Sequence, residues 1–588
     1  MSAARVFRLL PIGRNATVVP LLACLCAFVL VPLLIIFWSS FDGFKFDFSS
    51  YRAIFSDSIY STVLRRTFEI GITVTALCIL LGYPLAYLLT IVSGRTAVLI
   101  TTLVMVPLLT GVLIRMYSWM IIFGRRGVIN EFLIGLGLVD EPIELLNTSF
   151  GVHVGMVHVL IPIAIFTMYS SMARIDRQLV QAAAVLGASP VRTFLRVYLP
   201  MSLPGVLAAA ILVFVISIGY YIAPMLLGGP SDRMIAQLII SEVNTLLDLQ
   251  MGFALAVFLL VVTFLTLGIA GLLVPLELLW TSDRNLVAPA VRQAGIIGVI
   301  GRWTKGLGFY AFVVIEGGLN WLLQPIIRWV PIALYFYAAA MLTFLVAPII
   351  IVLILSFSSS DFLIFPPPGF SLRWYEKLLH AHDWHAALGF SIELGAIVAA
   401  IAVLLGTFGA FGLVRGKMPA RRAIFLFALT PVIIPEIILA LALYFFEAKM
   451  RILGTFWGLA IGHLVLAMPY VVVVMTAAIR GLNPDLEHAA SVHGARPVQT
   501  FYRVLIPLLR PSLVTSAFFA FLVSFDLLVI SIFLLGRQTP TLPLKFWADI
   551  KFETDPTLSA AASLIITVVV IGVGMTQWWR YRTYKSAM

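Results

Sequence analysis

The hydrophobic pattern of the chain consists of long apolar runs separated by short polar or charged segments. Most of these runs reach about 20 residues, the length that a helix needs to cross the hydrocarbon core of a bilayer. The pattern therefore predicts an all-α integral membrane protein with twelve transmembrane helices, six in each half of the chain. The runs fall at residues 17–38, 67–92, 97–123, 150–170, 204–227, 250–280, 332–357, 389–414, 423–446, 453–478, 511–535 and 558–579.

The two sets of runs are separated by residues 283–331. This stretch contains apolar pieces such as residues 309–315, but one more span here would move every later loop to the opposite side of the membrane. We therefore predict a cytoplasmic linker with an interfacial amphipathic helix. The first six-helix half is expected at residues 1–282 and the second at residues 332–588.

An internal repeat relates the two halves. Residues 177–206 and 484–513 align without gaps at an offset of 307, and about half of the positions are identical. Both copies lie between the fourth and fifth spans of their half, on the same side of the membrane. The halves are therefore predicted to be parallel repeats, related by an axis along the membrane normal.

Each copy of the repeat has the pattern of a helix, a sharp turn and a second helix. Good helix formers occupy residues 179–186 and 486–493 and are followed by Gly187 and Gly494, which suit a left-handed C-terminal cap. Pro190 and Pro497 then suit the first turn of a new helix. Two matched copies argue against a plain connector, because a connector has no reason to keep these residues in register.

Composition and charge support the membrane assignment. Hydrophobic residues make up 61% of the chain and charged residues only 11%, against roughly a quarter in soluble domains. Of the 39 basic residues, 24 fall in segments on the side of the N-terminus and 14 in loops on the other side. This bias predicts that both termini are cytoplasmic, so the net charge of +12 marks sidedness and not nucleic-acid binding.

No catalytic or metal-binding pattern accompanies the spans. The chain lacks a G-x-x-x-x-G-K-[ST] phosphate loop, and we find no paired carboxylates or nucleophile–histidine pattern. The three cysteines lie inside apolar runs and are expected to be buried hydrophobic residues. We predict that the chain is not an enzyme and holds neither a cofactor nor a metal.

Ionisable residues inside predicted spans are costly and mark either a transport path or an internal pair. Arg115 and Glu436 occupy nearly equivalent places in the third and ninth spans, so they could form a buried pair between the halves. Alternatively, Glu436 faces a translocation path. Glu69 and Glu393 also occupy matching places, where we expect the first turn of a helix, which favours acids; an acidic vestibule is the alternative.

Asp526 lies within the eleventh span, and the repeat offset places it opposite Gly219, next to Tyr220 and Tyr221. A carboxylate facing tyrosines across a pseudo-twofold axis could receive an ammonium group by charge pairing and cation–π contact. A polar residue satisfied at a helix–helix contact is an equally simple explanation.

The repeated loop resembles the EAA loop of ABC importer permeases, the coupling helix that docks on a cytoplasmic ATPase. Further stretches are similar to the spermidine/putrescine permease family, including residues 114–119, 227–230, 365–375, 435–436, 524–526 and 555–556. The resemblance covers nearly the whole chain and implies two fused permeases of the type I importer fold. The leading Glu of the loop is replaced by Gln181 and His488, although Glu487 is adjacent. The residues that the resemblance assigns to ATPase coupling are Gln181, Ala182, Ala183, Gly187, Glu487, His488, Ala489, Ala490 and Gly494.

The resemblance implies import of a small cation, most simply a polyamine, across the bacterial inner membrane. Its implied partners are two copies of an ATPase, which would carry ATP and Mg, and a periplasmic or extracellular binding protein that docks on the loops at residues 124–149 and 358–388. Tyr220, Tyr221, Asp526, Glu436 and Arg115 are the candidate path residues. Ferric iron, thiamine, opine or organophosphonate import within the same family is the alternative, and a twelve-helix secondary transporter is the rival from another class.

Overall fold

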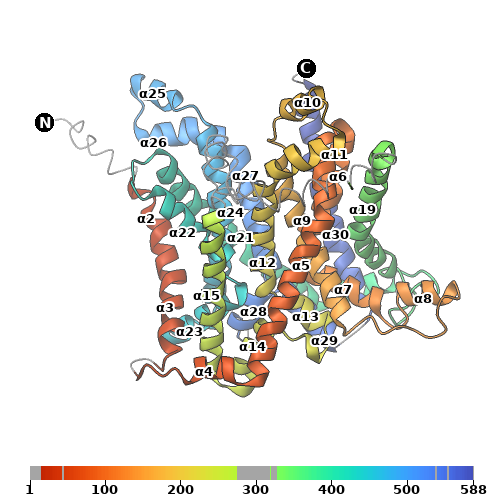
Figure 1. The fold of residues 1–588 in the computed structure, drawn as a ribbon. Helices are drawn as coiled ribbons and strands as arrows, with labels where there is room; N and C mark the ends of the chain where they lie inside the picture. The colour runs from red at the N-terminus through yellow and green to blue at the C-terminus, as the bar shows by residue number, and fades with distance from the viewer. Residues whose placement is uncertain are drawn as a thin grey trace. The chain divides into compact units, whose positions relative to one another are not determined.

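The computed structural model describes residues 15–42, 45–273, 318, 327–536, 539–552 and 555–586 (Figure 1). Within these residues the fold is helical, and the β-type pairing is limited to one antiparallel bridge between Ser358 and Phe370. The predicted linker at residues 283–331 lies almost entirely outside the described residues.

The helices of the first half of the chain follow the order of the predicted spans. They are α2 (Val19–Leu25), η2 (Cys26–Leu30), α3 (Val31–Ser39), α4 (Ser49–Ser56), α5 (Ser58–Ile91), α6 (Gly94–Leu109), α7 (Val112–Phe123), α8 (Val128–Gly135), α9 (Ser149–Met172), α10 (Arg177–Val185), α11 (Pro190–Thr193), η4 (Phe194–Tyr198), α12 (Leu199–Ile218), α13 (Ile222–Leu227), η5 (Pro230–Asp232), α14 (Ile235–Ser241), η6 (Glu242–Leu246) and α15 (Leu249–Leu273).

The second half repeats this order. Its helices are η8 (Ile327–Trp329), α19 (Val330–Leu355), α20 (Arg373–His380), α21 (His382–Arg415), α22 (Arg421–Ile433), α23 (Glu436–Met450), α24 (Phe456–Gly481), α25 (Asp485–Val492), α26 (Pro497–Thr500), η9 (Phe501–Leu505), α27 (Ile506–Asp526), α28 (Val529–Leu534), α29 (Leu542–Phe552) and α30 (Thr557–Ser586).

The membrane-spanning helices agree with the predicted spans in place and order. Among the described residues, nine helices are long and apolar enough to cross a membrane, and two further pairs are sharply bent. A shorter apolar helix at Thr557–Gly572 occupies the place of the last predicted span. The chain is an all-α integral membrane protein built from two repeats.

The third and ninth spans are broken, although each corresponds to one continuous apolar run in the sequence. The segment Val112–Gly135 turns 95° away from α6, and α23 turns 96° away from α22. Gly111 and Pro435 stand at these breaks as the residues before the second helix. Proline lacks the N–H that a continuing helix needs, and glycine tolerates the turn at little steric cost, so both residues favour a break.

The fifth and eleventh spans are also interrupted at matching positions. α12 ends at Ile218 and α13 begins at Ile222, while α27 ends at Asp526 and α28 begins at Val529. The offset of 307 that relates the loops also relates these breaks. A break exposes backbone N–H and C=O groups that an unbroken helix would satisfy, so it creates a polar position inside the membrane.

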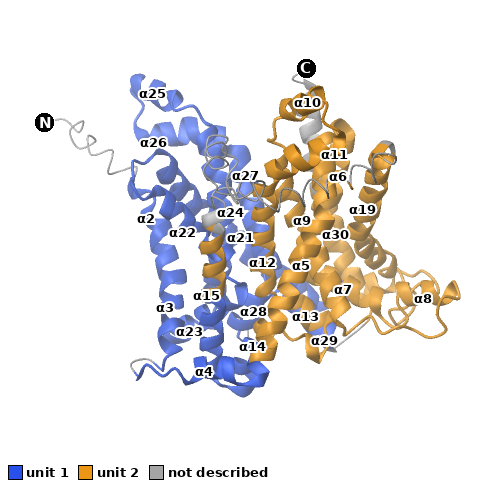
Figure 2. Cartoon of the chain, viewed as in Figure 1, with its two compact units in different colours: residues 1–60, 238–260, 379–553 blue, residues 61–237, 261–378, 554–588 orange. Residues whose placement is uncertain are grey.

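The chain folds into two compact units, and each takes helices from both halves (Figure 2). Unit 1 contains residues 1–60, 238–260 and 379–553, and unit 2 contains residues 61–237, 261–378 and 554–588. In unit 1, α2 packs on α21 and α3 packs on α23. In unit 2, α19 packs on α6, α7 and α30. The first span of each half therefore belongs to the unit that holds the central helices of the other half.

Candidate functional site

The two repeated loops have the predicted helix–glycine–helix geometry. α10 is followed by Gly187 with a φ of 83°, and α25 is followed by Gly494 with a φ of 80°. A side chain at either position would meet no atom within 4 Å, so the left-handed backbone and not lack of space requires glycine. Pro190 and Pro497 then begin α11 and α26, as predicted.

The face that these loops present is exposed and partly apolar. Val185 and Leu186 are each 87% exposed, and Val492 is 84% exposed. Large apolar side chains this exposed indicate a surface that is covered by a partner. Of the residues predicted to couple to an ATPase, all but one are exposed or half-buried: Gln181, Ala182, Ala183, Gly187, His488, Ala489, Ala490 and Gly494.

An aromatic contact fixes each loop to the second span of its repeat. In unit 2, Tyr87 of α5 meets Phe194 of η4 edge to face, with ring centroids 6.1 Å apart. In unit 1, Phe411 of α21 meets Phe501 of η9 in the same way at 6.0 Å. The contact is therefore a shared property of the repeats, and it joins each loop to a long membrane helix.

Glu487 is the exception among the predicted coupling residues. Its carboxylate is buried and accepts a hydrogen bond from Arg415 Nε at 2.7 Å, and Arg415 also donates to the Leu482 carbonyl at 2.9 Å. Arg415 is the last residue of α21, so one guanidinium joins the ends of α21 and α24 to α25. The first loop has a different link, an exposed hydrogen bond from Arg177 to the Thr90 carbonyl.

Two acidic residues come together at the helix breaks of unit 1. Glu436 is the first residue of α23, and its carboxylate lies at the backbone N–H groups of Val529 and Ile530, where α28 begins. Asp526, the last residue of α27, is exposed and lies near enough to act on Glu436 electrostatically. Two neighbouring carboxylates repel each other, and a cation relieves that repulsion.

Sequence reasoning missed two residues near Asp526 and Glu436. Tyr470 of α24 is 39% exposed and lies within electrostatic reach of Glu436. His463, also on α24, is buried and hydrogen-bonds the hydroxyls of Ser524 and Ser531 at 2.9 and 3.2 Å, so it joins α27 to α28 across the break. A lone histidine and a lone tyrosine in an apolar span carry no pattern that would reveal these contacts.

The remaining predicted path residues lie in unit 2. Arg115 of α7 is 2% exposed and lies near His158, whose ring is 5.6 Å from that of Trp119. Tyr220 is half-buried and Tyr221 is buried, and both lie between α12 and α13. Arg115 and Glu436 belong to different units, and so do Asp526 and the two tyrosines. Both predicted pairings therefore stay predictions.

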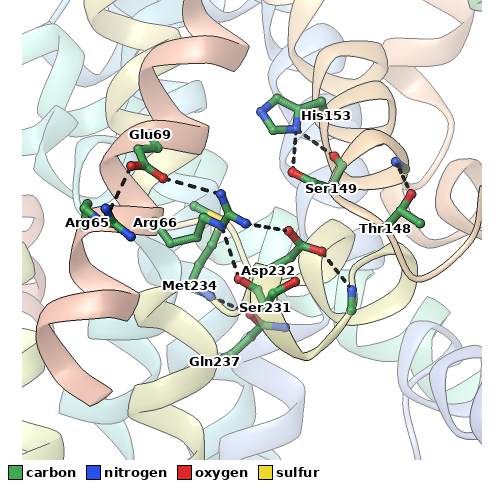
Figure 3. Close-up of polar contacts among 12 residues, drawn as sticks. Arg65, Arg66, Glu69, Thr148, Ser149, His153, Ser231, Asp232, Met234 and Gln237 are labelled. Atoms are coloured by element: carbon green, nitrogen blue, oxygen red, sulfur yellow. Dashed lines mark hydrogen bonds and ion pairs between the residues drawn. The ribbon is translucent and has the colours of Figure 1, made fainter. Parts of the chain in front are cut away.

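The expected place of Glu69 and Glu393 in a first helical turn is wrong. α5 begins at Ser58 and α21 at His382, so each acid is the twelfth residue of its helix. Extra polar turns before the apolar run lengthen both helices. Figure 3 shows that Glu69 instead faces Arg66, which also reaches Asp232. Arg66 Nη1 lies 3.4 Å from Glu69 Oε2, and Arg66 Nη2 lies 3.7 Å from Asp232 Oδ1. The acidic vestibule stays a prediction.

The Arg66 contacts order the loop after α13. Arg66 Nε donates to the Ser231 carbonyl at 3.2 Å, and the buried Asp232 accepts from the Gly229 N–H at 3.1 Å (Figure 3). The loop belongs to one of the stretches that carry the family resemblance. Over the described part of the chain, no group of three or more His, Cys, Asp or Glu residues could hold a metal ion.

The sequence pattern of the binding-protein-dependent transport system inner membrane component family matches residues 16–276 and 389–581. The chain belongs to this family. Its two matches cover both repeats, so the protein is a fused two-repeat permease of an ATP-driven importer, and the secondary transporter is excluded. As a family member it is a multi-pass membrane protein that works with an ATPase and a substrate-binding protein.

Single permeases of polyamine systems are similar to parts of this chain. The spermidine/putrescine transport system permease PotB of Salmonella typhimurium strain SL1344 is 32% identical over 262 residues, which is 43% of this chain and 91% of the relative. PotB of Escherichia coli K12 is 32% identical over 42% of the chain and 94% of the relative. The putrescine permease PotI of E. coli K12 is 32% identical over 40% of this chain and 86% of the relative.

A solved structure of a bacterial ABC transporter that imports the acidic polysaccharide alginate is a distant match. It covers 44% of this chain and 96% of that chain, at 16% identity and a TM-score of 0.31. A likeness this weak carries no information about the substrate.

Proposed function

We propose that this fused permease imports polyamines, such as putrescine or spermidine, delivered by a soluble binding protein. The observation that carries the proposal is the 32% identity to named polyamine permeases over nearly their whole length. Each relative matches about two fifths of this chain, as expected when one chain contains the equivalent of two such permeases.

The acidic site at the helix breaks of unit 1, formed by Asp526 and Glu436, suits such a substrate. A polyamine carries ammonium groups on a flexible apolar chain, so its recognition requires carboxylates and aromatic faces. Asp526 supplies an exposed carboxylate beside Glu436, and the Tyr470 ring offers a cation–π partner. We assign Asp526 and Glu436 to the path, together with Tyr220, Tyr221 and Arg115 from the other unit.

Transport follows from movement of the two loops. The exposed faces around Gly187 and Gly494 dock on two copies of an ATPase, which carry ATP and Mg. Closure of the ATPase pair moves the loops, and the aromatic contacts at Phe194 and Phe501 pass this movement to α5 and α21. The termini and both loops are cytoplasmic in this proposal, and the binding protein docks on the opposite side of the inner membrane.

The test is uptake by proteoliposomes that contain the permease, its ATPase and its binding protein. We expect ATP-dependent accumulation of labelled putrescine or spermidine, with competition between the two. The same vesicles are assayed with Fe³⁺, thiamine, an opine and an organophosphonate. Accumulation of one of these without uptake of either polyamine would overturn the substrate while leaving the importer assignment intact.

A further inference from the structure

We propose that α8 is a lipid-binding arm that lies in the plane of the bilayer, within the leaflet opposite the short turn between α5 and α6. The arm consists of α8 and the residues directly after it, up to Leu138. This inference does not depend on the transported substrate.

The arm carries large apolar side chains that nothing in unit 2 covers. Phe132 is 63% exposed, Leu136 is 58% exposed and Leu138 is 66% exposed. Phe132 and Leu136 are four residues apart and therefore share a face of the helix. By contrast, ten of the twelve residues of α7, directly before the arm, are buried.

The direction of the arm follows from the break in the third span. The segment Val112–Gly135 turns 95° from α6, so it runs along the membrane plane where α6 runs across it. Figure 1 shows α8 extending sideways from unit 2, crosswise to α5. The turn between α7 and α8 requires glycine at position 127, because a Cβ atom there would lie 2.2 Å from the Ile121 carbonyl oxygen.

The depth of the arm follows from the length of α6. Its 16 residues rise about 24 Å from the turn at Ser93. A bilayer with its headgroups is about 40–45 Å thick. The break at Thr110 therefore lies inside the far leaflet, and a segment that leaves at a right angle stays in it. Lipid, and not a soluble protein, is the partner available at that depth.

A hydrogen-bonded clamp holds the arm to the loop that follows. The buried Asn130 donates to the carbonyls of Gly124 and Ile143 at 3.0 Å each and accepts from the Ile143 N–H at 2.8 Å. The exposed acids Asp140, Glu141 and Glu144 lie in this returning loop. The clamp thus places an apolar helix, suited to acyl chains, beside a loop whose acids suit the water-facing boundary of the leaflet.

The test measures collision rates of a nitroxide spin label in proteoliposomes. Single cysteines replace Phe132 or Leu136 in a background where Cys24, Cys26 and Cys78 are alanine. Glu141→Cys is the matched control on the same loop. We expect the labels at 132 and 136 to collide readily with oxygen and several-fold less with water-soluble Ni(II)-EDDA than the label at 141.

Ready Ni(II)-EDDA collision at 132 and 136 would overturn the proposal. If addition of the binding protein then protects these labels, the arm is a protein-docking surface. ATP-dependent uptake by the cysteine-free parent shows that the background is folded. If that parent is inactive, a ketone-bearing amino acid carries the label at the same positions in the natural background, with the same two outcomes.

Discussion

At the residue scale, Gly187 and Gly494 are positions in the two repeated loops where backbone conformation dictates the amino acid. The φ angles are 83° at Gly187 and 80° at Gly494, and a β-branched residue held at either angle adds strain of about 1–3 kcal/mol at the cap. The surrounding space is open, so the fold itself has room for the side chain.

We therefore expect Gly187→Val and Gly494→Val to insert normally but to lose most substrate uptake, because the strained cap reorients the face that docks on the ATPase. Uptake and membrane abundance are measured side by side. Gly481→Val is the control, since Gly481 also has open space but lacks a left-handed φ. Wild-type uptake in both loop variants would contradict the coupling role of the loops.

The carboxylate of Asp526 gives a second residue-scale prediction. Asp526→Asn removes charge but keeps shape, and we expect putrescine uptake to fall roughly tenfold or more, as loss of a partly screened ion pair would cause. A monoacetylated analogue, with one ammonium fewer, should lose less. Equal loss for both substrates would assign Asp526 a structural role.

Sequence alone identified the acids but not their neighbours. Asp526 and Glu436 stand out because carboxylates are rare in membrane spans. Their proximity depends on two helix breaks, and Pro435 signals only one of them. Likewise, the start of the apolar run predicts Glu69 in a first helical turn, whereas α5 begins at Ser58. Hydrophobicity marks where a helix is buried, not where its hydrogen bonds begin.

At the element scale, the two coupling helices differ in the polar contact that ties them to the second span of their repeat. The second is tied to α21 by the Arg415–Glu487 pair, with side chains 10% and 8% exposed. The first has an exposed bond from Arg177 to a backbone carbonyl in the comparable place. The repeat in the sequence predicts equivalent loops. It could not predict the ion pair, because Arg415 lies outside the repeated stretch at residues 484–513.

Breaking the pair should therefore uncouple the second loop. Loss of one partner of a buried pair costs roughly 3–5 kcal/mol, so Glu487→Gln should reduce uptake severely, while Arg177→Ala, which removes an exposed bond, should change it little. The exchange of charges in the Arg415→Glu, Glu487→Arg double variant should restore part of the uptake. Substrate-stimulated ATP hydrolysis is measured in parallel, and an unchanged value in Glu487→Gln would contradict the role of the pair.

At the scale of the whole molecule, two loops in one chain predict the composition of the transporter. Each loop has its own exposed face, so we expect the purified complex to contain one permease chain and two ATPase copies. Native mass spectrometry of the complex measures this ratio directly. Replacement of Leu186 by Asp should lower ATPase occupancy at one loop, and unchanged binding of both copies would argue against docking there.

The exchange of first spans between repeats has a consequence for biosynthesis. Leu21 packs against Gly409 so closely that a side chain there would lie within 2.3 Å of its Cδ2 atom. Roughly 390 residues separate the two positions, and at about 5–20 residues per second the ribosome needs about 20–80 s to make them. During that interval the helix that carries Leu21 lies in the bilayer without its final packing partner. Nascent chains truncated before Gly409 should therefore be the ones that membrane quality control removes.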